Sequence, residues 1–204
     1  YARVYVEKRL IPNQFLKKLY FSENFNKFVD NLIPSKYKLE ENDPRLVIPF
    51  FNVYGELIAV QGRSLNYSSL RYITIKIKDE PKIFGMDRID LAKPVYVVEG
   101  PIDSLFLPNC IAAAGSDISF RDLPKGELIF VYDNESRNPE IVARMEKVIR
   151  NSYNICIWPN TIREKDINDM ILAGKTPEDI ENIIKENTYF GLTAKLQLVK
   201  WRNC

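Results

Sequence analysis

The pattern of apolar and polar positions divides the chain near residue 93. Upstream, residues 46–52 and 57–62 are apolar runs separated by Tyr54-Gly55, which predicts two strands around a turn. The segment "RYITIKI" alternates with a period of two, as a further strand does. Earlier still, "YARVYVEKRL" and "PNQFLKKLYF" carry helical signals, the second starting just after Pro12. We therefore expect a mixed α and β region over 1–92.

Downstream, short apolar segments alternate with helical ones. In order they are "VYVVE", the short helical "PIDSLFLP", "CIAAAG", "LIFVY", the amphipathic "PEIVARMEKVIRN" and "NICIW". Such an alternation predicts βαβ units and a mostly parallel sheet that is covered on both faces. After residue 175, a Thr-Pro-Glu start predicts one or two closing helices. The expected fold class is α/β, with a mostly parallel sheet over 93–175 and a helical segment over 176–204.

Composition limits the chemistry that the chain could perform. It has 29 basic and 27 acidic residues, a formal net charge of +2, and no histidine. The lack of histidine excludes Ser-His-Asp and Cys-His catalysis and the usual zinc ligand sets. The cysteines Cys110, Cys156 and Cys204 are scattered, which suggests free thiols in a reducing compartment. No apolar run approaches the ~20 residues that span a bilayer, so we expect no membrane partner.

Acidic residues follow the predicted strands of the second region. "VYVVE" ends on Glu99, "LIFVY" is followed by Asp133 and Glu135, and "KDIND" beyond "NICIW" offers Asp166 and Asp169. Ligands bind at the carboxyl ends of parallel strands, and alternation along an extended chain would put Asp133 and Glu135 on one side. Such a cluster suits Mg²⁺ or Mn²⁺. The alternative is that these acids only cap helices.

Basic residues lie within or between the strands of the first region. They are Arg45, Arg63, Arg71, Lys76, Lys78, Lys82 and Arg88. For Lys76 and Lys78 a solvated strand face is an equally good interpretation. Arg63 follows Gly62, where a small residue lets a ligand approach. Tyr67, Tyr72 and Phe84 could stack on bases or simply pack. A basic region beside an acidic edge predicts a polyanion ligand and chemistry on a phosphate.

Three acidic motifs resemble the TOPRIM fold as DnaG-type primases use it. They are "VVEGPID", which holds Glu99 and Asp103, "VYDNE" with Asp133 and Glu135, and "KDIND". Upstream, "RLVIPFFNVYGELIAVQGRSLNYSSLRYITI" is similar to the basic RNA-polymerase subdomain of these primases, and "PKIFGMDRI" to the segment that closes it. The resemblance is strongest to the primases of T-even-like bacteriophages. It makes 1–92 the basic subdomain and 93–175 the TOPRIM domain.

The resemblance implies a DNA primase, a metal-dependent polymerase that makes RNA primers from ribonucleoside triphosphates on single-stranded DNA. Glu99, Asp133 and Glu135 would be catalytic and would bind Mg²⁺ or Mn²⁺. It assigns further residues as follows: Asp103 and Asp166 as additional metal ligands, Asn168 and Asp169 as weaker candidates, and Arg45, Arg63, Arg71 and Lys82 as nucleotide or nucleic-acid contacts. Glu135 departs from the Asp of the usual motif, but it can still bind a cation.

The resemblance also implies partners and a setting. A replicative hexameric helicase would be the protein partner, in the cytoplasm of an infected bacterial host. The chain begins at Tyr1 without Met, and it has no cysteine cluster. It therefore looks like a catalytic fragment, and zinc is expected only on an N-terminal ribbon outside it.

Two other interpretations stay open. TOPRIM domains also serve nucleases and topoisomerases, although no nucleophilic tyrosine can be identified for a topoisomerase. Alternatively, the chain could be a non-catalytic module that docks on the helicase. The apolar residues of the last segment would then form the docking surface, or they would pack against the sheet; they are Leu192, Leu196, Leu198 and Trp201.

Overall fold

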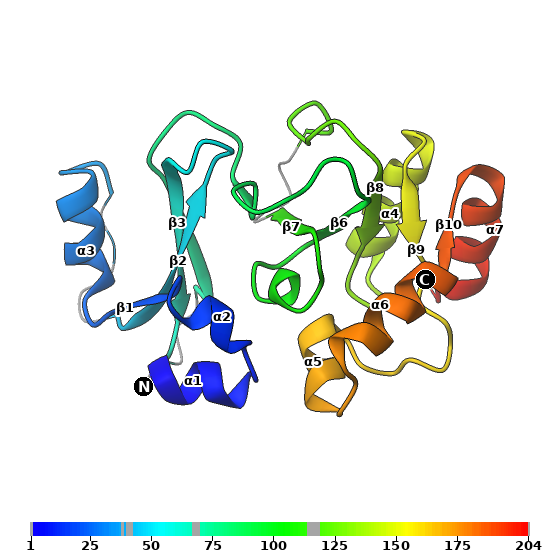
Figure 1. Ribbon diagram of the computed structural model, residues 1–204, viewed down its shortest axis with the longest axis horizontal. Coiled ribbons are helices and arrows are strands. Elements are labelled where there is room, and N and C mark those ends of the chain that lie inside the picture. Colours follow the sequence, from blue (N-terminus) through cyan, green and yellow to red (C-terminus); the bar gives the residue numbers. More distant parts are fainter. Residues whose placement is uncertain (1, 38, 40–42, 67–69, 114–118, 204) are drawn as a thin grey trace. The chain divides into compact units, whose positions relative to one another are not determined.

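The protein divides into two compact α/β units (Figure 1). The computed structural model describes all residues except 1, 38, 40–42, 67–69, 114–118 and 204, so Tyr67 and Cys204 lie outside the described residues. The first unit comprises residues 1–88 and 114–122, and the second comprises 89–113 and 123–204. The predicted α/β class is confirmed. The functional division into 1–92, 93–175 and 176–204 stays a prediction.

The first unit is built on an antiparallel sheet. Its elements are α1 (Ala2–Lys8), α2 (Asn13–Leu16), β1 (Tyr20–Ser22), α3 (Phe25–Leu32), β2 (Arg45–Phe51), β3 (Leu57–Ser64), β4 (Tyr72–Lys76) and β5 (Ile83–Phe84). The strands β1 to β4 follow one another across the sheet in chain order. The three strands expected from the apolar pattern are confirmed as β2, β3 and β4. The pattern did not predict β1 or α3.

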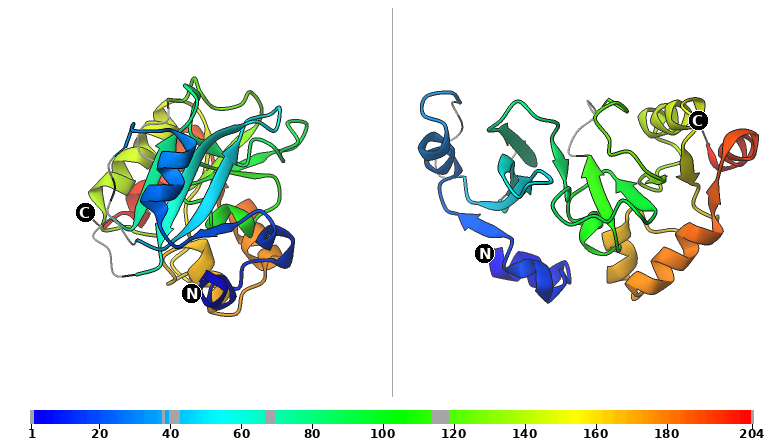
Figure 2. Two further views of the ribbon diagram at one scale, coloured as in Figure 1. Left: turned by 90° about the vertical axis from the view of Figure 1, so that its left-hand side faces the viewer. Right: turned by 45° about the horizontal axis from the view of Figure 1, so that its top comes forward.

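A helix covers one face of this sheet (Figure 2). Phe25 and Val29 of α3 pack with Val47, Val60 and Ile75 from β2, β3 and β4. Burial of these side chains, rather than the intrinsic preference of an eight-residue segment, stabilises α3. Asn24 caps the helix by accepting a hydrogen bond from the backbone N–H of Lys27 at 2.9 Å.

The second unit is built on a mostly parallel sheet, as predicted. Its elements are β6 (Val95–Val98), the 3₁₀ helix η1 (Asp103–Leu105), β7 (Cys110–Ala113), β8 (Leu128–Val131), α4 (Pro139–Arg150), β9 (Asn154–Cys156), α5 (Ile167–Leu172), α6 (Pro177–Glu186), β10 (Thr188–Tyr189) and α7 (Gly191–Trp201). Within this unit the strand order is β10-β9-β8-β6-β7. Strands β9, β8, β6 and β7 are parallel, and β10 joins β9 antiparallel.

Local signals explain where the helices of the second unit begin. Pro139 opens α4 after the cap residue Asn138, and Thr176 and Asp179 form a reciprocal capping box on α6. The predicted helix in "PIDSLFLP" is only one 3₁₀ turn, and the closing segment forms two helices separated by β10. Among the described residues, Cys110 and Cys156 are buried and belong to no disulfide, as expected. Within the same described part, no helix is long and apolar enough to cross a membrane.

Gly62 of β3 lies against the buried side chains of Phe25 and Arg45. This close packing leads to a first testable prediction. A Cβ atom there would lie 2.6 Å from Cζ of Phe25 and 2.8 Å from Cδ of Arg45. We expect Gly62→Ala to lower the free energy of unfolding by about 1–3 kcal/mol, because the packed ring and guanidinium must shift. Thermal unfolding measures the loss. In the background of Phe25→Leu the same change should cost less, and an unchanged midpoint for Gly62→Ala would contradict the packing described.

Candidate active site

Two carboxylates meet at the carboxyl ends of the adjacent strands β6 and β8. The strands run parallel with Val98 opposite Val131, so Glu99 and Asp133 leave the sheet at the same edge. The backbone N–H of Asp133 donates to Oε1 of Glu99 at 3.3 Å. Nη1 of Arg144, on α4, donates to Oε2 of Glu99 at 2.8 Å. Both oxygens of the Glu99 carboxylate are therefore held by the protein.

The chain turns between Asp133 and Glu135. The backbone N–H of Glu135 donates to the carbonyl oxygen of Asp133 at 2.9 Å, which is a three-residue turn. The chain is therefore not extended between these residues, so the expected alternation does not determine on which side the two side chains lie. Glu135 instead lies beside Lys165, with 3.3 Å between its Oε1 and the lysine Nζ. The two acids still share one electrostatic environment, because each interacts with Glu99.

Asp103 and Asp166 approach from the neighbouring segments. Oδ1 of Asp103 accepts a hydrogen bond from the backbone N–H of Asn168 at 2.9 Å. A Cβ atom at Gly100 would lie 2.9 Å from Oδ2 of Asp103, so the close approach at this position suits glycine. Asp166 caps α5 through the backbone N–H of Asp169, at 2.7 Å. Asn168 and Asp169 thus contact these carboxylates through their backbones.

Helix capping explains only part of this acidic set. Asp166 caps α5, and the capping interpretation is therefore correct for this residue. A metal-binding role for Asp166 stays a prediction. Asp133 is not the cap of the helix that follows, because Asn138 caps α4. A carboxylate at the end of a buried strand without a capping role is the kind of group that functional sites retain.

Burial and mutual repulsion shift the pKa values of these acids upward. The pKa of Asp133 is raised to about 8, first by burial and then by the negative charges of Glu99, Asp103 and Asp166, with Lys165 opposing the shift. Burial also raises the pKa of Glu99, although the backbone N–H of Asp133 and the guanidinium of Arg144 oppose it. The carboxylates therefore disfavour one another's ionised forms near neutral pH.

The donor chemistry of this cluster fits a hard divalent cation. Carboxylate oxygens are the ligands that Mg²⁺ and Mn²⁺ prefer, and a cation relieves the repulsion that raises the pKa of Asp133. Among the residues that the structure describes, however, no three acidic or other ligating side chains are gathered closely enough to hold a metal ion. In this structure Glu99 and Glu135 contact Arg144 and Lys165 instead.

Sequence reasoning did not find Arg144 or Lys165. Arg144 lies in the middle of α4, where an arginine has the appearance of an ordinary exposed residue. Lys165 belongs to the "KDIND" motif, in which the resemblance assigns roles only to Asp166, Asn168 and Asp169. Their roles follow from tertiary contacts, since Arg144 lies 45 positions from Glu99 and Lys165 lies 30 positions from Glu135 in the sequence.

The predicted basic contacts of the first unit have different environments. Arg45 is only 1% exposed, and its guanidinium donates to Oδ2 of Asp43 and to the carbonyl oxygens of Gly62 and Leu70. These bonds give Arg45 a structural role in place of a ligand contact. Arg71 is exposed and Lys82 is half-buried. Lys76 and Lys78 pair with Asp79 and Glu56, as the solvated-face interpretation predicts; these pairs are 2.7 and 2.9 Å long.

Arg63 lies between two tyrosine rings. Its guanidinium carbon is 5.6 Å from the ring centre of Tyr5 and 4.8 Å from that of Tyr72, and Nε donates to the Tyr5 hydroxyl at 3.2 Å. Stacking orients the cation and leaves it largely buried. Tyr72 therefore packs on Arg63, and Phe84 packs on Phe50 at 5.3 Å between ring centres.

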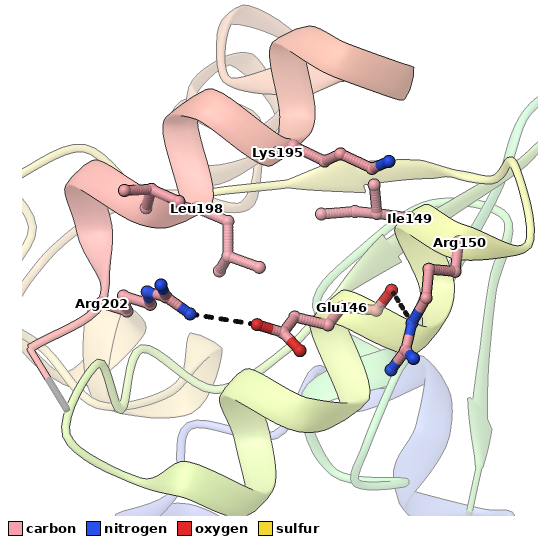
Figure 3. Close-up of a pocket in the computed structure, with 7 residues that line it drawn as sticks. Glu146, Ile149, Arg150, Lys195, Leu198 and Arg202 are labelled. Carbon is pink, nitrogen blue, oxygen red and sulfur yellow. Dashed lines mark hydrogen bonds and ion pairs between the residues drawn. The ribbon is translucent and has the colours of Figure 1, made fainter.

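A pocket of about 340 Å³ lies in the second unit between α4 and α7 (Figure 3). Ile149, Leu198 and Val199 supply its apolar lining, and Arg150 and Lys195 lie at its sides. An ion pair at 3.1 Å between Glu146 and Arg202 spans it, as the dashed line in Figure 3 shows. None of the predicted site residues lines this pocket.

Comparison with known proteins identifies related chains. The sequence is 40% identical over 202 residues to the DNA primase of Enterobacteria phage T4, an alignment that covers 97% of this chain and 59% of that protein. The RNA polymerase domain of Mycobacterium tuberculosis primase DnaG superposes with a TM-score of 0.68 at 18% identity, covering 90% of this chain and 75% of that one. A DnaG primase catalytic domain bound to single-stranded DNA gives 0.67 at 16%, covering 96% and 76%. No protein-family model matches.

The raised pKa of Asp133 makes the stability of the metal-free protein depend on pH. A carboxyl whose pKa is about 8 in the folded protein, against 3.8 as its ordinary value, ionises more readily when unfolded. Stability is therefore lost as pH rises from about 4 to 8. We expect Asp133→Asn to raise the unfolding midpoint at pH 8 by at least about 2 °C, with a smaller gain near pH 4.5.

Thermal unfolding in a chelator across this pH range measures the effect. Asp122→Asn, at an exposed aspartate of the other unit, serves as the matched control and should leave the midpoint unchanged. If Asp133→Asn lowered the midpoint at pH 8, Asp133 would be a stabilising residue and the electrostatic description would be wrong.

Proposed function

We propose that this chain, which is homologous to the DNA primase of bacteriophage T4 and has the fold of DnaG catalytic cores, carries the primer-synthesis activity of a DNA primase. It would join ribonucleotides from ribonucleoside triphosphates into short RNA primers on single-stranded DNA. The observation that carries the proposal is 40% identity along 97% of this chain. The chain spans about three fifths of the length of that relative.

Glu99, Asp133 and Glu135 are the residues that would hold Mg²⁺ or Mn²⁺, with Asp103 and Asp166 at the same acidic edge. A bound ion of this kind would neutralise triphosphate charge and make the primer 3′-hydroxyl a better nucleophile. Two basic side chains contact the carboxylates at this edge. Arg144 orients Glu99 at 2.8 Å, and Lys165 places a positive charge 3.3 Å from Glu135.

Basic residues of the first unit would bind the phosphates of the nucleotide or of the template and primer. Arg71 and Lys82 are accessible enough for this role, and Arg63 is pre-oriented by Tyr5 and Tyr72. Contacts of this kind do not depend on base sequence and weaken as salt concentration rises. The DNA-bound DnaG catalytic domain, which has the same fold, supports single-stranded DNA as the template.

Replacement of Glu99 tests the activity directly. Glu99→Gln keeps the shape of the side chain but removes the charge, so we expect primer synthesis with Mg²⁺ or Mn²⁺ to fall about 100-fold or more. Incorporation of labelled ribonucleotides on single-stranded DNA measures it, with circular dichroism to verify folding. Glu186→Gln, an exposed glutamate of α6, is the control and should retain activity. Near-normal synthesis by folded Glu99→Gln would contradict the assignment.

The same assay separates the polymerase from a nuclease with a similar acidic edge. Labelled single-stranded DNA is incubated without ribonucleotides under the same metal conditions. Cleavage that Glu99→Gln abolishes, without any primer synthesis by the unaltered protein, would favour the nuclease. All the relatives and neighbours reported above are primases, which is why we place polymerisation first.

We further propose that α7 contacts a replicative hexameric helicase in the cytoplasm of an infected bacterium. Leu198 and Trp201 are 3% and 6% exposed, so the packing interpretation is correct for them. Leu192, Leu196 and Val199 are 72%, 57% and 58% exposed and recur at positions i, i+4 and i+7 of the helix. This spacing forms one apolar stripe, a feature that protein partners bind.

Polar replacement of the stripe tests this contact. We expect Leu192→Ser with Leu196→Ser to weaken helicase binding about 10-fold while the unfolding midpoint changes little, because both side chains are exposed. Leu198→Ala should show the opposite pattern, with lower stability and retained binding. A pull-down titration and thermal unfolding measure the two effects. Unchanged helicase affinity in the double variant would remove α7 as the contact surface.

A further inference from the structure

Asn134, between the two predicted metal ligands Asp133 and Glu135, uses every polar group of its amide. Its Nδ2 donates to the carbonyl oxygens of Ile162 and Glu164, both at 3.1 Å, and its Oδ1 accepts from Nε1 of Trp201 at 3.1 Å. Its backbone N–H donates to the carbonyl oxygen of Lys165 at 2.7 Å. Because a tryptophan N–H is only a donor and the two carbonyls are only acceptors, this set permits one orientation of the amide.

Asn203, two residues beyond the end of α7, makes a second link to the same segment. The backbone N–H of Asn203 donates to the carbonyl oxygen of Ser136 at 2.9 Å, and its Nδ2 donates to Oγ of Ser136 at 2.9 Å. The residues on both sides of Glu135 are therefore bound by Trp201, the last residue of α7, and by Asn203, two residues beyond it. Trp201 is 6% exposed, so its indole N–H has no ready access to water as an alternative partner.

These contacts join the parts of the candidate site that the sheet does not join. Strands β6 and β8 position Glu99 and Asp133, but Glu135 follows a turn beyond the sheet, and Lys165 and Asp166 lie on the loop before α5. Asn134 connects the turn to that loop, and Trp201 holds Asn134. A shift of this amide would move the backbone that carries Asp133 and Glu135 relative to the backbone that carries Lys165 and Asp166.

We propose that Trp201 and Asn203 are positioning residues for the acidic site, and that Trp201 acts through Asn134. Trp201 orients the Asn134 amide, and Asn203 fixes Ser136, so the end of α7 determines where the Glu135 carboxylate lies relative to Glu99 and Asp133. The metal-binding consequence rests on the proposed function, whereas the ordering of residues 134–136 does not. This role requires neither a ligand in the pocket between α4 and α7 nor a partner protein bound to α7.

Trp201→Phe is the decisive variant, because it retains an aromatic ring and removes the indole N–H donor; the ring volume that it also loses from this buried position is addressed by the packing control below. Residues that support metal ligands through hydrogen bonds typically change metal affinity by about 10- to 100-fold. We expect Trp201→Phe to weaken Mn²⁺ binding about 10-fold by isothermal titration of the metal alone. Hydrogen exchange at the amides of residues 134–136 in the metal-free protein should become faster, since these amides lose their support.

A double-mutant cycle tests whether Trp201 acts through Asn134. If it does, Trp201→Phe should have little further effect in a protein that already carries Asn134→Ala. Leu198→Ala is the matched control, because it loosens the buried face of the same helix without removing a hydrogen-bonding group. It should lower stability but leave Mn²⁺ affinity and the exchange of residues 134–136 unchanged at a temperature where the protein is folded.

The outcomes are distinguishable. Unchanged exchange of residues 134–136 in Trp201→Phe would overturn the positioning role, as would an equal effect of Leu198→Ala. Full additivity of Trp201→Phe and Asn134→Ala would overturn the route through Asn134. If the unaltered protein bound no Mn²⁺, the proposed metal site would fail, while the exchange comparison would still decide whether α7 orders the segment.

Discussion

Repulsion among partly buried carboxylates is the constraint around which the second unit is arranged. Asp133 has a pKa raised to about 8 because it is buried and faces Glu99, Asp103 and Asp166. A protein selected for stability alone would place apolar or amide side chains at the ends of such buried strands. That the acids are present argues for a use that outweighs their energetic cost, because functional sites commonly retain groups that destabilise the fold.

The surrounding residues limit this repulsion without removing it. Arg144 and the backbone N–H of Asp133 hold the two oxygens of Glu99, Lys165 lies beside Glu135, and backbone N–H groups of α5 hold Asp103 and Asp166. Most of these compensating donors are backbone groups, which add no net charge to the cluster. The acidic edge therefore keeps a negative potential while Glu99, Asp103 and Asp166 have defined directions, and both properties favour binding of a divalent cation.

Features that depend on the local sequence pattern were predicted correctly. Features that depend on contacts between residues far apart in the sequence were not. Strands β6 and β8 were predicted because their apolar runs are continuous, and their parallel pairing brings Glu99 and Asp133 to one edge. The helix α3 was missed because its stability comes from packing on the sheet. Arg45 was assigned to a ligand because its partners Gly62 and Leu70 are 17 and 25 residues away, which the sequence pattern does not reveal. The turn at Asn134 likewise depends on Lys165 and Trp201.

The carboxylates of the candidate site are not equally well supported by the fold. Glu99 leaves a paired strand and is held at both oxygens, so its position follows from the sheet and from α4. Glu135 is separated from the sheet by a turn, and its longer side chain has an additional rotatable bond compared with aspartate, which increases the entropy lost when it is fixed. A site with one ligand on rigid scaffold and another on a turn needs added bonds at the turn. Asn134, Trp201 and Asn203 supply them, so the residues at and just beyond the end of the closing helix support the turn that carries Glu135.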